Sequence, residues 1–185
     1  MTEQRPDRVL SSSKEPVEGL AVTAYAKINL TLEVLGRFPD GYHRIASLLQ
    51  TIALADRLLL EIGEGLSLQC NWPELEGTEN SVLRAAKLLQ EEGGTRKGAR
   101  MRLEKGIPAA AGLGGHSSDA AAALLGLNRL WGLSLPLPRL LALASRLGSD
   151  VPFFLYGGTA LAEGRGEQIT PLPPLAQHWV VLLVP

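Results

Sequence analysis

The sequence predicts an α+β fold, because strand-like and helix-like stretches are mixed without the strict alternation of a doubly wound parallel sheet. Two observations carry this prediction. Apolar residues alternate with a period of two through residues 20–35, which is typical of a strand with one buried face. Helix-forming apolar stretches occupy residues 81–92, 117–131 and 136–147. The length of 185 residues suits one ordinary domain.

The N-terminal part divides into a tail, a strand and a turn. Residues 1–18 are polar and show no periodicity, so we predict a loose tail there. The strand that follows buries its even-numbered apolar positions. Its opposite face presents Tyr25, Lys27 and Asn29 side by side. Residues 36–41 (GRFPDG) have turn chemistry, and Tyr42 and His43 follow directly.

In the middle of the chain we expect two short strands, a helix and a further strand. Alternating leucines at residues 58–62 and 66–68 flank two glycines, which predicts two strands and a tight turn. Asn80 can cap a helix over residues 81–92, and Gly93 and Gly94 end that helix. Residues 100–105 alternate as another strand.

The second half begins with a loop of small residues and continues with two helices. An alanine-rich helix is predicted from Ser117 to Trp131, packed closely against another element. A further helix runs from Pro136 to Leu147 and is closed by Gly148. Residues 158–162 and 179–184 are predicted to be late strands.

Composition excludes several classes of function. Lys and Arg number 18 against 19 Asp and Glu, and a net charge of −1 argues against electrostatic binding to nucleic acid. The single cysteine, Cys70, rules out an internal disulfide and a CxxC zinc or redox site. No apolar run approaches the roughly 20 residues that span a membrane, so we expect a cytoplasmic protein. Composition gives no oligomeric state.

The loop before Ser117 carries the most chemistry. Glycines at 112, 114 and 115 let backbone amides approach an anion, because no Cβ intervenes. The helix that follows adds unpaired amides and the positive end of its dipole. The hydroxyls of Ser117 and Ser118 can cap this helix or reach a phosphate or its metal. The loop matches neither the P-loop motif nor the GxGxxG fingerprint. The loop pattern alone also fits a serine-capped turn that binds no ligand.

Three segments in order resemble one family. Residues 108–121 (PAAAGLGGHSSDAA) resemble the ATP-binding loop of the GHMP small-molecule kinases. Residues 26–30 (AKINL), followed by GRFPDGYH at 36–43, resemble the opening of the GHMP kinases that act on 4-diphosphocytidyl-2-C-methyl-D-erythritol. Residues 147–154 (LGSDVPFF) resemble the catalytic-aspartate segment of the same family.

The resemblance implies ATP-dependent phosphorylation of the 2-hydroxyl of that diphosphocytidyl substrate, in non-mevalonate isoprenoid synthesis. ATP normally arrives with Mg²⁺, and Ser118 or Asp119 could lie near the ion, although no metal ligand is assigned. Lys27 and Asp150 match the catalytic pair, and Asn29, Tyr42 and His43 match substrate-holding positions. The matching nucleotide-binding positions are Lys105, Pro108, Ala109, Ala110, Ala111, Gly112, Leu113, Gly114, Gly115, His116, Ser117 and Ser118.

The resemblance also implies a domain organisation. The implied fold is a ribosomal-protein-S5-domain-2-like sandwich, with a mixed sheet and helices on one side. Residues 19–185 would form this N-terminal domain, and we expect the family's second domain, with its own glycine-rich segment, to be missing from these 185 residues. The chain would then carry one wall of the active cleft and could be inactive alone.

Two departures from the family loop bear on these expectations. Alanines at 109–111 and His116 stand where the family has more glycine, and alanine is strained wherever positive φ is needed. The competing hypotheses are a non-catalytic nucleotide-binding module and a GHMP kinase for another small alcohol, such as homoserine or mevalonate. The segment Asp40–His43 argues against another alcohol.

Overall fold

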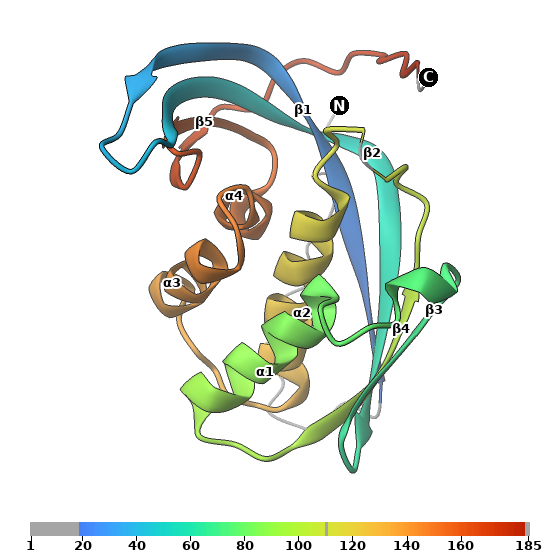
Figure 1. The fold of residues 1–185 in the computed structure, drawn as a ribbon. Helices are drawn as coiled ribbons and strands as arrows, with labels where there is room; N and C mark the ends of the chain where they lie inside the picture. The colour runs from blue at the N-terminus through green and yellow to red at the C-terminus, as the bar shows by residue number, and fades with distance from the viewer. Residues whose placement is uncertain (1–18, 110, 184–185) are drawn as a thin grey trace.

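The computed structural model describes residues 19–109 and 111–183, which form one sheet covered on one side by helices (Figure 1). The strands are β1 (Gly19–Arg37), β2 (His43–Gly63), β3 (Leu66–Cys70), β4 (Gly98–Glu104), β5 (Thr159–Gly164) and β6 (Gln168–Leu172). The helices are α1 (Ser81–Gly93), α2 (Gly115–Leu130), α3 (Leu137–Leu147) and α4 (Val151–Tyr156), with a 3-10 turn, η1, at Pro73–Leu75.

The six-stranded sheet is mixed. Its strand order is β3-β4-β2-β5-β6, and β1 pairs with β2. The pair β3–β4 is parallel and the other pairs are antiparallel. The predicted α+β fold, with a mixed sheet and helices on one side, is confirmed.

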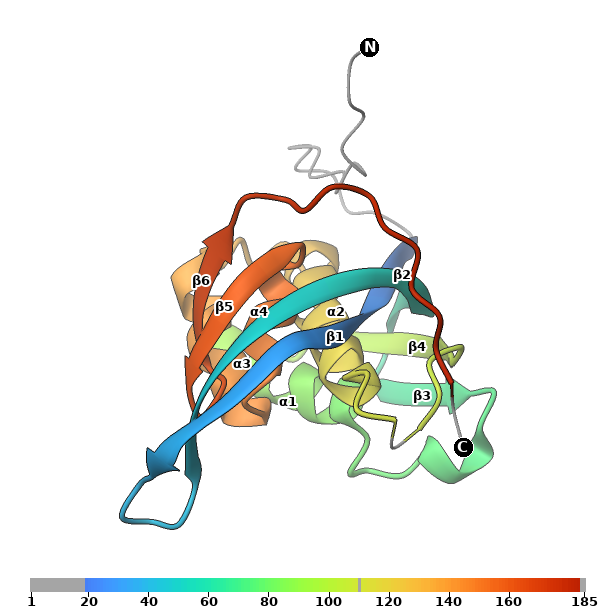
Figure 2. The ribbon, with the colours of Figure 1, turned by 90° about the horizontal axis from the view of Figure 1, so that it is seen from above.

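The long hairpin of β1 and β2 departs from simple alternation. The pairing register shifts between Tyr25 and Lys27, and such a bulge turns the following side chains. Ala26 and Lys27 are therefore both buried, whereas the sequence predicts opposite faces for them. The far half of β1 corrects a second prediction. The apolar residues predicted to be buried there are exposed, because this end of the hairpin projects beyond the helical layer (Figure 2); they are Leu30, Leu32 and Val34.

The predicted strands at residues 58–62 and 66–68 are present, but they are not neighbours. Strand β4 lies between β2 and β3 and pairs with both. Gly98 permits the close approach, since a Cβ there would lie 2.5 Å from the carbonyl oxygen of Gly63. The tight turn therefore links two strands separated by a third.

The helices largely follow the sequence. The Asn80 side chain accepts a hydrogen bond from the Val82 amide at 2.8 Å, and Gly94 ends α1 in the left-handed conformation, as predicted. Helix α3 also agrees with its prediction. The short helix α4 and strand β6 are not predicted. The strand expected at 179–184 is wrong over residues 179–183, which have no regular structure and are exposed.

Helix α2 is central to the core and lies against β1 and β2 (Figure 1). A Cβ on Gly126 would lie 2.3 Å from Leu60 Cδ1, so only glycine allows this approach. Four consecutive alanines, at 120–123, are buried, and because they span a full turn their small side chains let α2 pack closely against both the sheet and the neighbouring helices. This packing fixes the N-terminus of α2, where the glycine loop ends.

Candidate active site

The glycine loop connects β4 to α2 and is tied to β1. The Lys27 amide donates a hydrogen bond to the Leu113 carbonyl oxygen at 2.9 Å. Gly112 and Gly114 have φ of +69° and +74°, which explains glycine at both positions. Ala109 and Ala111 do not have positive φ, so the strain expected there is not found. Ala110 lies outside the described residues.

Helix α2 begins two residues earlier than predicted. Gly114 is its N-cap, and the Ser118 amide donates to the Gly114 carbonyl oxygen at 2.8 Å. The amides of residues 115–117 are the first of the helix, and such amides have no partner within it. The Ser118 hydroxyl donates to the Tyr25 carbonyl oxygen at 2.7 Å and is buried. Ser118 therefore anchors the helix to β1 and is not directed at a ligand.

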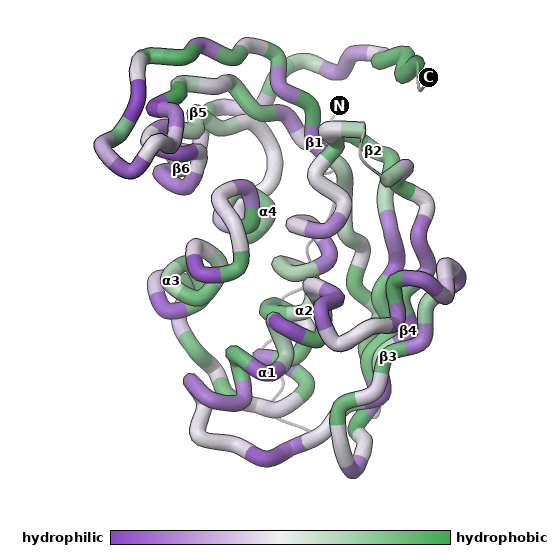
Figure 3. The backbone as a smooth tube through the Cα atoms, viewed as in Figure 1, coloured by the Kyte–Doolittle hydropathy of each residue, from purple (hydrophilic) through white to green (hydrophobic). Residues whose placement is uncertain are grey.

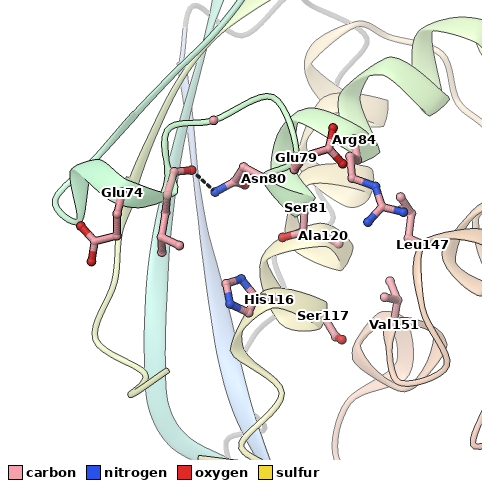
Figure 4. Close-up of a pocket in the computed structure, with 12 residues that line it drawn as sticks. Glu74, Glu79, Asn80, Ser81, Arg84, His116, Ser117, Ala120, Leu147 and Val151 are labelled. Carbon is pink, nitrogen blue, oxygen red and sulfur yellow. Dashed lines mark hydrogen bonds between the residues drawn. The ribbon is translucent and has the colours of Figure 1, made fainter. Parts of the chain in front are cut away.

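Two cavities flank this helix N-terminus. The larger, about 390 Å³, lies between the starts of α1 and α2 (Figure 4). His116 and Ser117 line both cavities. The second cavity, about 180 Å³, follows the loop from Ile107 to Ser117. Within the described chain the buried Ser81 hydroxyl, at the larger cavity, has no hydrogen-bond partner.

Lys27 and Asp150 meet although 123 positions separate them. Lys27 Nζ lies 3.3 Å from Asp150 Oδ2, and the two side chains are 8% and 39% exposed. Lys27 Nζ also donates to Asn29 Oδ1 at 2.6 Å. Asn29 Nδ2 in turn donates to the buried Ser47 hydroxyl at 2.7 Å. A half-exposed carboxylate is thus paired with a lysine that the protein holds in place.

Lys105 lies beneath the loop in a buried cluster of three charges. Its ammonium is ion-paired with Asp56 and lies 2.7 Å from Asp119 Oδ2, and all three side chains are at most 2% exposed. Asp56 Oδ1 accepts hydrogen bonds from the amides of Gly106 and Ile107 at 2.6 and 2.8 Å. The cluster therefore joins β2, the start of the loop and α2. In this arrangement the Lys105 ammonium contacts two carboxylates. Lys105 also lines the second cavity, and its predicted nucleotide contact stays a prediction.

The cluster has unusual protonation. Burial raises the pKa of Asp119 from 3.8 to about 7, with Lys105 opposing the rise and Asp56 adding to it. Burial alone would lower the pKa of Lys105, but the two carboxylates hold it above its ordinary value. Asp119 Oδ1 is buried and has no hydrogen-bond partner within the described chain.

Tyr42 and His43 lie where β2 begins, at the tip of the hairpin. Tyr42 is 58% exposed, and the guanidinium of Arg165 lies over its ring at 4.5 Å from the centroid. His43 Nε2 accepts a hydrogen bond from Arg37 Nε at 3.2 Å. The turn that carries Arg165 also borders Asp150, since a Cβ on Gly166 would lie 3.7 Å from Asp150 Oδ1. The tip of the hairpin and the Lys27–Asp150 pair therefore flank one turn.

Comparison with known proteins agrees with this geometry. The family model of the GHMP kinases N terminal domain matches residues 80–158, which contain the glycine loop and Asp150. The 4-diphosphocytidyl-2-C-methyl-D-erythritol kinase of Dehalococcoides mccartyi is 48% identical over 166 residues, covering 90% of this chain and 58% of the relative. The corresponding kinase of Pelotomaculum thermopropionicum is 52% identical, with 90% and 59% covered. This chain contains a GHMP kinase N-terminal domain.

Solved structures agree on the fold of this GHMP domain. A crystal structure of 4-(cytidine 5′-diphospho)-2C-methyl-D-erythritol kinase superposes with a TM-score of 0.73 at 46% identity, covering 83% of this chain and 55% of that one. Homoserine kinase from Cytophaga hutchinsonii reaches 0.66 at 21% identity, covering 86% and 53%, which shows the fold alone. The chain spans a little under 60% of the length of the Dehalococcoides and Pelotomaculum kinases.

Some residues of the GHMP domain's site were not found by sequence reasoning. Asp56 accepts a hydrogen bond from the start of the glycine loop, and Ser47 accepts one from Asn29. Arg165 lies over the ring of Tyr42. The apolar strand segment 52–60 contains two charged residues, Asp56 and Arg57, and Asp56 falls on the same alternating face as Leu58 and Leu60, which is the signal that could have identified it. Ser47 and Arg165 carry no such signal, because their partners are distant in sequence.

Neither a metal cluster nor a membrane span is found in the described part of the GHMP domain. Residues 19–109 and 111–183 contain no group of three or more His, Cys, Asp or Glu side chains that could hold a metal ion. The Asp119 oxygen that contacts Lys105 is already paired. No helix within the same ranges is long and apolar enough to cross a membrane.

Proposed function

We propose that the protein transfers the γ-phosphoryl group of ATP to the 2-hydroxyl of 4-diphosphocytidyl-2-C-methyl-D-erythritol, a cytoplasmic step of non-mevalonate isoprenoid synthesis. One observation carries the proposal: the Lys27–Asp150 pair lies beside a glycine loop that ends at a helix N-terminus, and the Lys27 amide is bonded to that loop. The names of the relatives supply the substrate class. We propose residues 19–185 as the nucleotide-binding domain of this kinase.

The pair suits proton and phosphoryl transfer to an alcohol. Asp150 accepts the proton of the substrate hydroxyl, whose oxygen forms the new bond to the γ-phosphorus while the bond to the β-phosphate oxygen breaks and ADP leaves. Lys27, 3.3 Å from Asp150, favours the ionised carboxylate and steadies the developing negative charge. Asn29 keeps the Lys27 ammonium in place through its 2.6 Å hydrogen bond.

The nucleotide is proposed to bind along the glycine loop. The amides of residues 115–117 and the dipole of α2 favour the phosphates, and the adjoining cavities leave room for the nucleoside. His116 and Ser117 border both cavities and are the side chains best placed to contact ATP. Mg²⁺ would enter bound to the ATP phosphates, since the described side chains offer no cluster of ligands. Lys105 is proposed to act from beneath, by holding the loop.

The substrate's cytidine is proposed to bind at the tip of the hairpin. Tyr42 offers an exposed aromatic ring for stacking on the pyrimidine, and His43 offers a directional hydrogen bond. Asn29 lies farther along β1, where its side-chain amide is bonded to Lys27 and Ser47, so it supports the catalytic lysine. Homoserine and mevalonate carry no nucleobase. A binding site for cytosine would therefore favour the proposed substrate over these two alcohols.

The test is a transfer assay on the full natural polypeptide that contains these 185 residues. With ATP, Mg²⁺ and the diphosphocytidyl substrate, we expect a new phosphate monoester on the 2-hydroxyl, detected by phosphorus NMR. Asp150→Asn and Lys27→Met should each lower kcat by about 10²–10⁴-fold, because each removes a group that acts in the transition state. Glu61→Gln, which changes an exposed carboxylate paired with Arg100, is the matched control and should leave kcat unchanged.

The other hypotheses are distinct outcomes of the same assay. Phosphorylation of homoserine or mevalonate in preference to the cytidyl substrate would assign another GHMP reaction. Nucleotide binding that survives Asp150→Asn, without turnover in either protein, would indicate a non-catalytic module. Either result contradicts the proposal.

A further inference from the structure

The turn between β5 and β6, residues 165–167, contacts the tip of the β1–β2 hairpin through Arg165. The Arg165 guanidinium lies 4.5 Å from the Tyr42 ring centroid and 5.4 Å from the Phe38 ring centroid. The same group is ion-paired with Asp40. One arginine therefore contacts three side chains of the hairpin tip, and both Arg165 and Asp40 are about half exposed or less.

The turn itself is fixed by its own hydrogen bonds. The Arg165 amide donates to Glu167 Oε2 at 2.7 Å, and the Gly166 amide donates to the Glu163 carbonyl oxygen at 3.0 Å. Gly164 and Gly166 have φ of +74° and +110°, so the chain reverses without strain. On its other side the turn borders Asp150, at the 3.7 Å approach described for Gly166. Arg165 is therefore held at a set distance from the proposed catalytic carboxylate.

We propose that Arg165 is a positioning residue for the cytidine of the substrate. Its guanidinium covers one face of the Tyr42 ring and leaves the other face available to a pyrimidine. By pairing with Asp40 it also fixes the tip that carries Tyr42 and His43 relative to Asp150. The inference rests on the proposed function, because it concerns the same substrate site.

The chemistry of arginine suits this position. A planar guanidinium can stack on an aromatic ring and pair with a carboxylate at once, whereas the compact ammonium of lysine cannot present a flat face to the ring. Arg165→Lys should thus keep the Asp40 ion pair but lose the stacking on Tyr42, so that the Tyr42 ring is only partly held in place. Arg165→Met keeps the length of the side chain and removes both contacts.

The experiment measures binding of cytidine diphosphate by calorimetry and the KM values of both substrates, on the full natural polypeptide. Arg165→Met should weaken cytidine diphosphate binding about tenfold, or about 1.4 kcal/mol, and raise the KM of the cytidyl substrate similarly. The KM for ATP should stay within about twofold. Arg165→Lys should give an intermediate value. Arg100→Met, which removes another exposed arginine from an ion pair, is the control.

A double-mutant cycle separates positioning from a direct contact. If Arg165 acts through Tyr42, Arg165→Met should cost less than about twofold in a Tyr42→Leu background. An undiminished cost there, an unchanged dissociation constant in Arg165→Met, or an equal rise in both KM values would each overturn the inference. A wild-type protein that does not bind cytidine diphosphate would overturn it as well. A protein that binds this probe with the expected Arg165 dependence but transfers no phosphate would contradict only the proposed function.

Discussion

Among single residues, Lys27 has the most consequential position, because a bulge in β1 turns it from the outer face toward the interior. Its backbone binds the glycine loop, and its side chain contacts Asp150 and Asn29. A lysine that is 8% exposed loses much of its hydration, and its two polar partners compensate for that loss. The same residue thereby couples the loop to the proposed catalytic carboxylate.

Asp119 gives a prediction about stability and pH. Its pKa is about 7 in the folded protein against 3.8 ordinarily, so the folded state binds this proton more tightly than the unfolded state. The resulting stabilisation is complete below about pH 4 and is lost as the pH rises through about 7. Asp119→Asn keeps the shape and cannot ionise. The free energy of unfolding of Asp119→Asn should therefore rise relative to that of wild type between about pH 5 and pH 8, measured by urea titration.

The control for this prediction is an acidic residue whose surroundings are open. Glu61→Gln removes an exposed carboxylate on β2, and its stability relative to wild type should change little over the same pH range. A constant difference between wild type and Asp119→Asn from about pH 5 to pH 8 would show that Asp119 does not carry the proton.

At the scale of elements, the glycine loop is the part whose geometry is most constrained. A Cβ on Gly114 would lie 2.6 Å from Phe154 Cζ and 3.1 Å from Lys27 Cγ, and the φ of +74° is itself strained for alanine. Gly112 has a similar φ of +69° but open space around it. Comparing a substitution at Gly114 with one at Gly112 therefore distinguishes the cost of backbone strain from the cost of steric crowding.

We expect Gly114→Ala to lower the free energy of unfolding by about 2–4 kcal/mol, the sum of strain and overpacking, and to weaken ATP binding. Gly112→Ala should cost only the strain, about 1–2 kcal/mol. Urea unfolding and nucleotide titration of both variants provide the comparison. Equal losses in the two variants would mean that contact with Phe154 and Lys27 does not constrain the loop.

The elements that the sequence predicts correctly are those with local signals. Asn80 and Gly94 bound α1 at both ends, and the alanine-rich stretch becomes α2. The wrong predictions concern strands whose formation or neighbours depend on pairing with residues far away in the sequence. The insertion of β4 between β2 and β3 depends on strand pairing across the sheet, and the apolar run at 179–183 has no neighbouring strand to pair with among the described residues. Local patterns do not contain that information.

The candidate site was predictable to a similar extent. Motif resemblance named Lys27, Asp150 and the loop before their geometry was known. It could not show that Ser118 bonds to the Tyr25 carbonyl oxygen or that Lys105 lies between two buried carboxylates. Those contacts join positions between 14 and 93 residues apart, so they emerge only when the chain is folded.

For the whole molecule, the arrangement matters more than any one motif. The sheet brings β1 beside α2, and α2 contacts α4, whose first turn follows Asp150 (Figure 1). Hydrophilic and hydrophobic stretches alternate along the hairpin tip and the strands near it (Figure 3). The fold thus brings the N-terminus of α2 close to the ammonium–carboxylate pair of Lys27 and Asp150.

The most direct measurement is a crystal structure of the full natural polypeptide with a non-hydrolysable ATP analogue and the diphosphocytidyl substrate. We predict the triphosphate against the amides of residues 115–117, and the sugar hydroxyl between Lys27 Nζ and Asp150 at about 3–3.5 Å from the γ-phosphorus. Phosphates bound away from the start of α2, or a substrate hydroxyl remote from Lys27 and Asp150, would contradict the account.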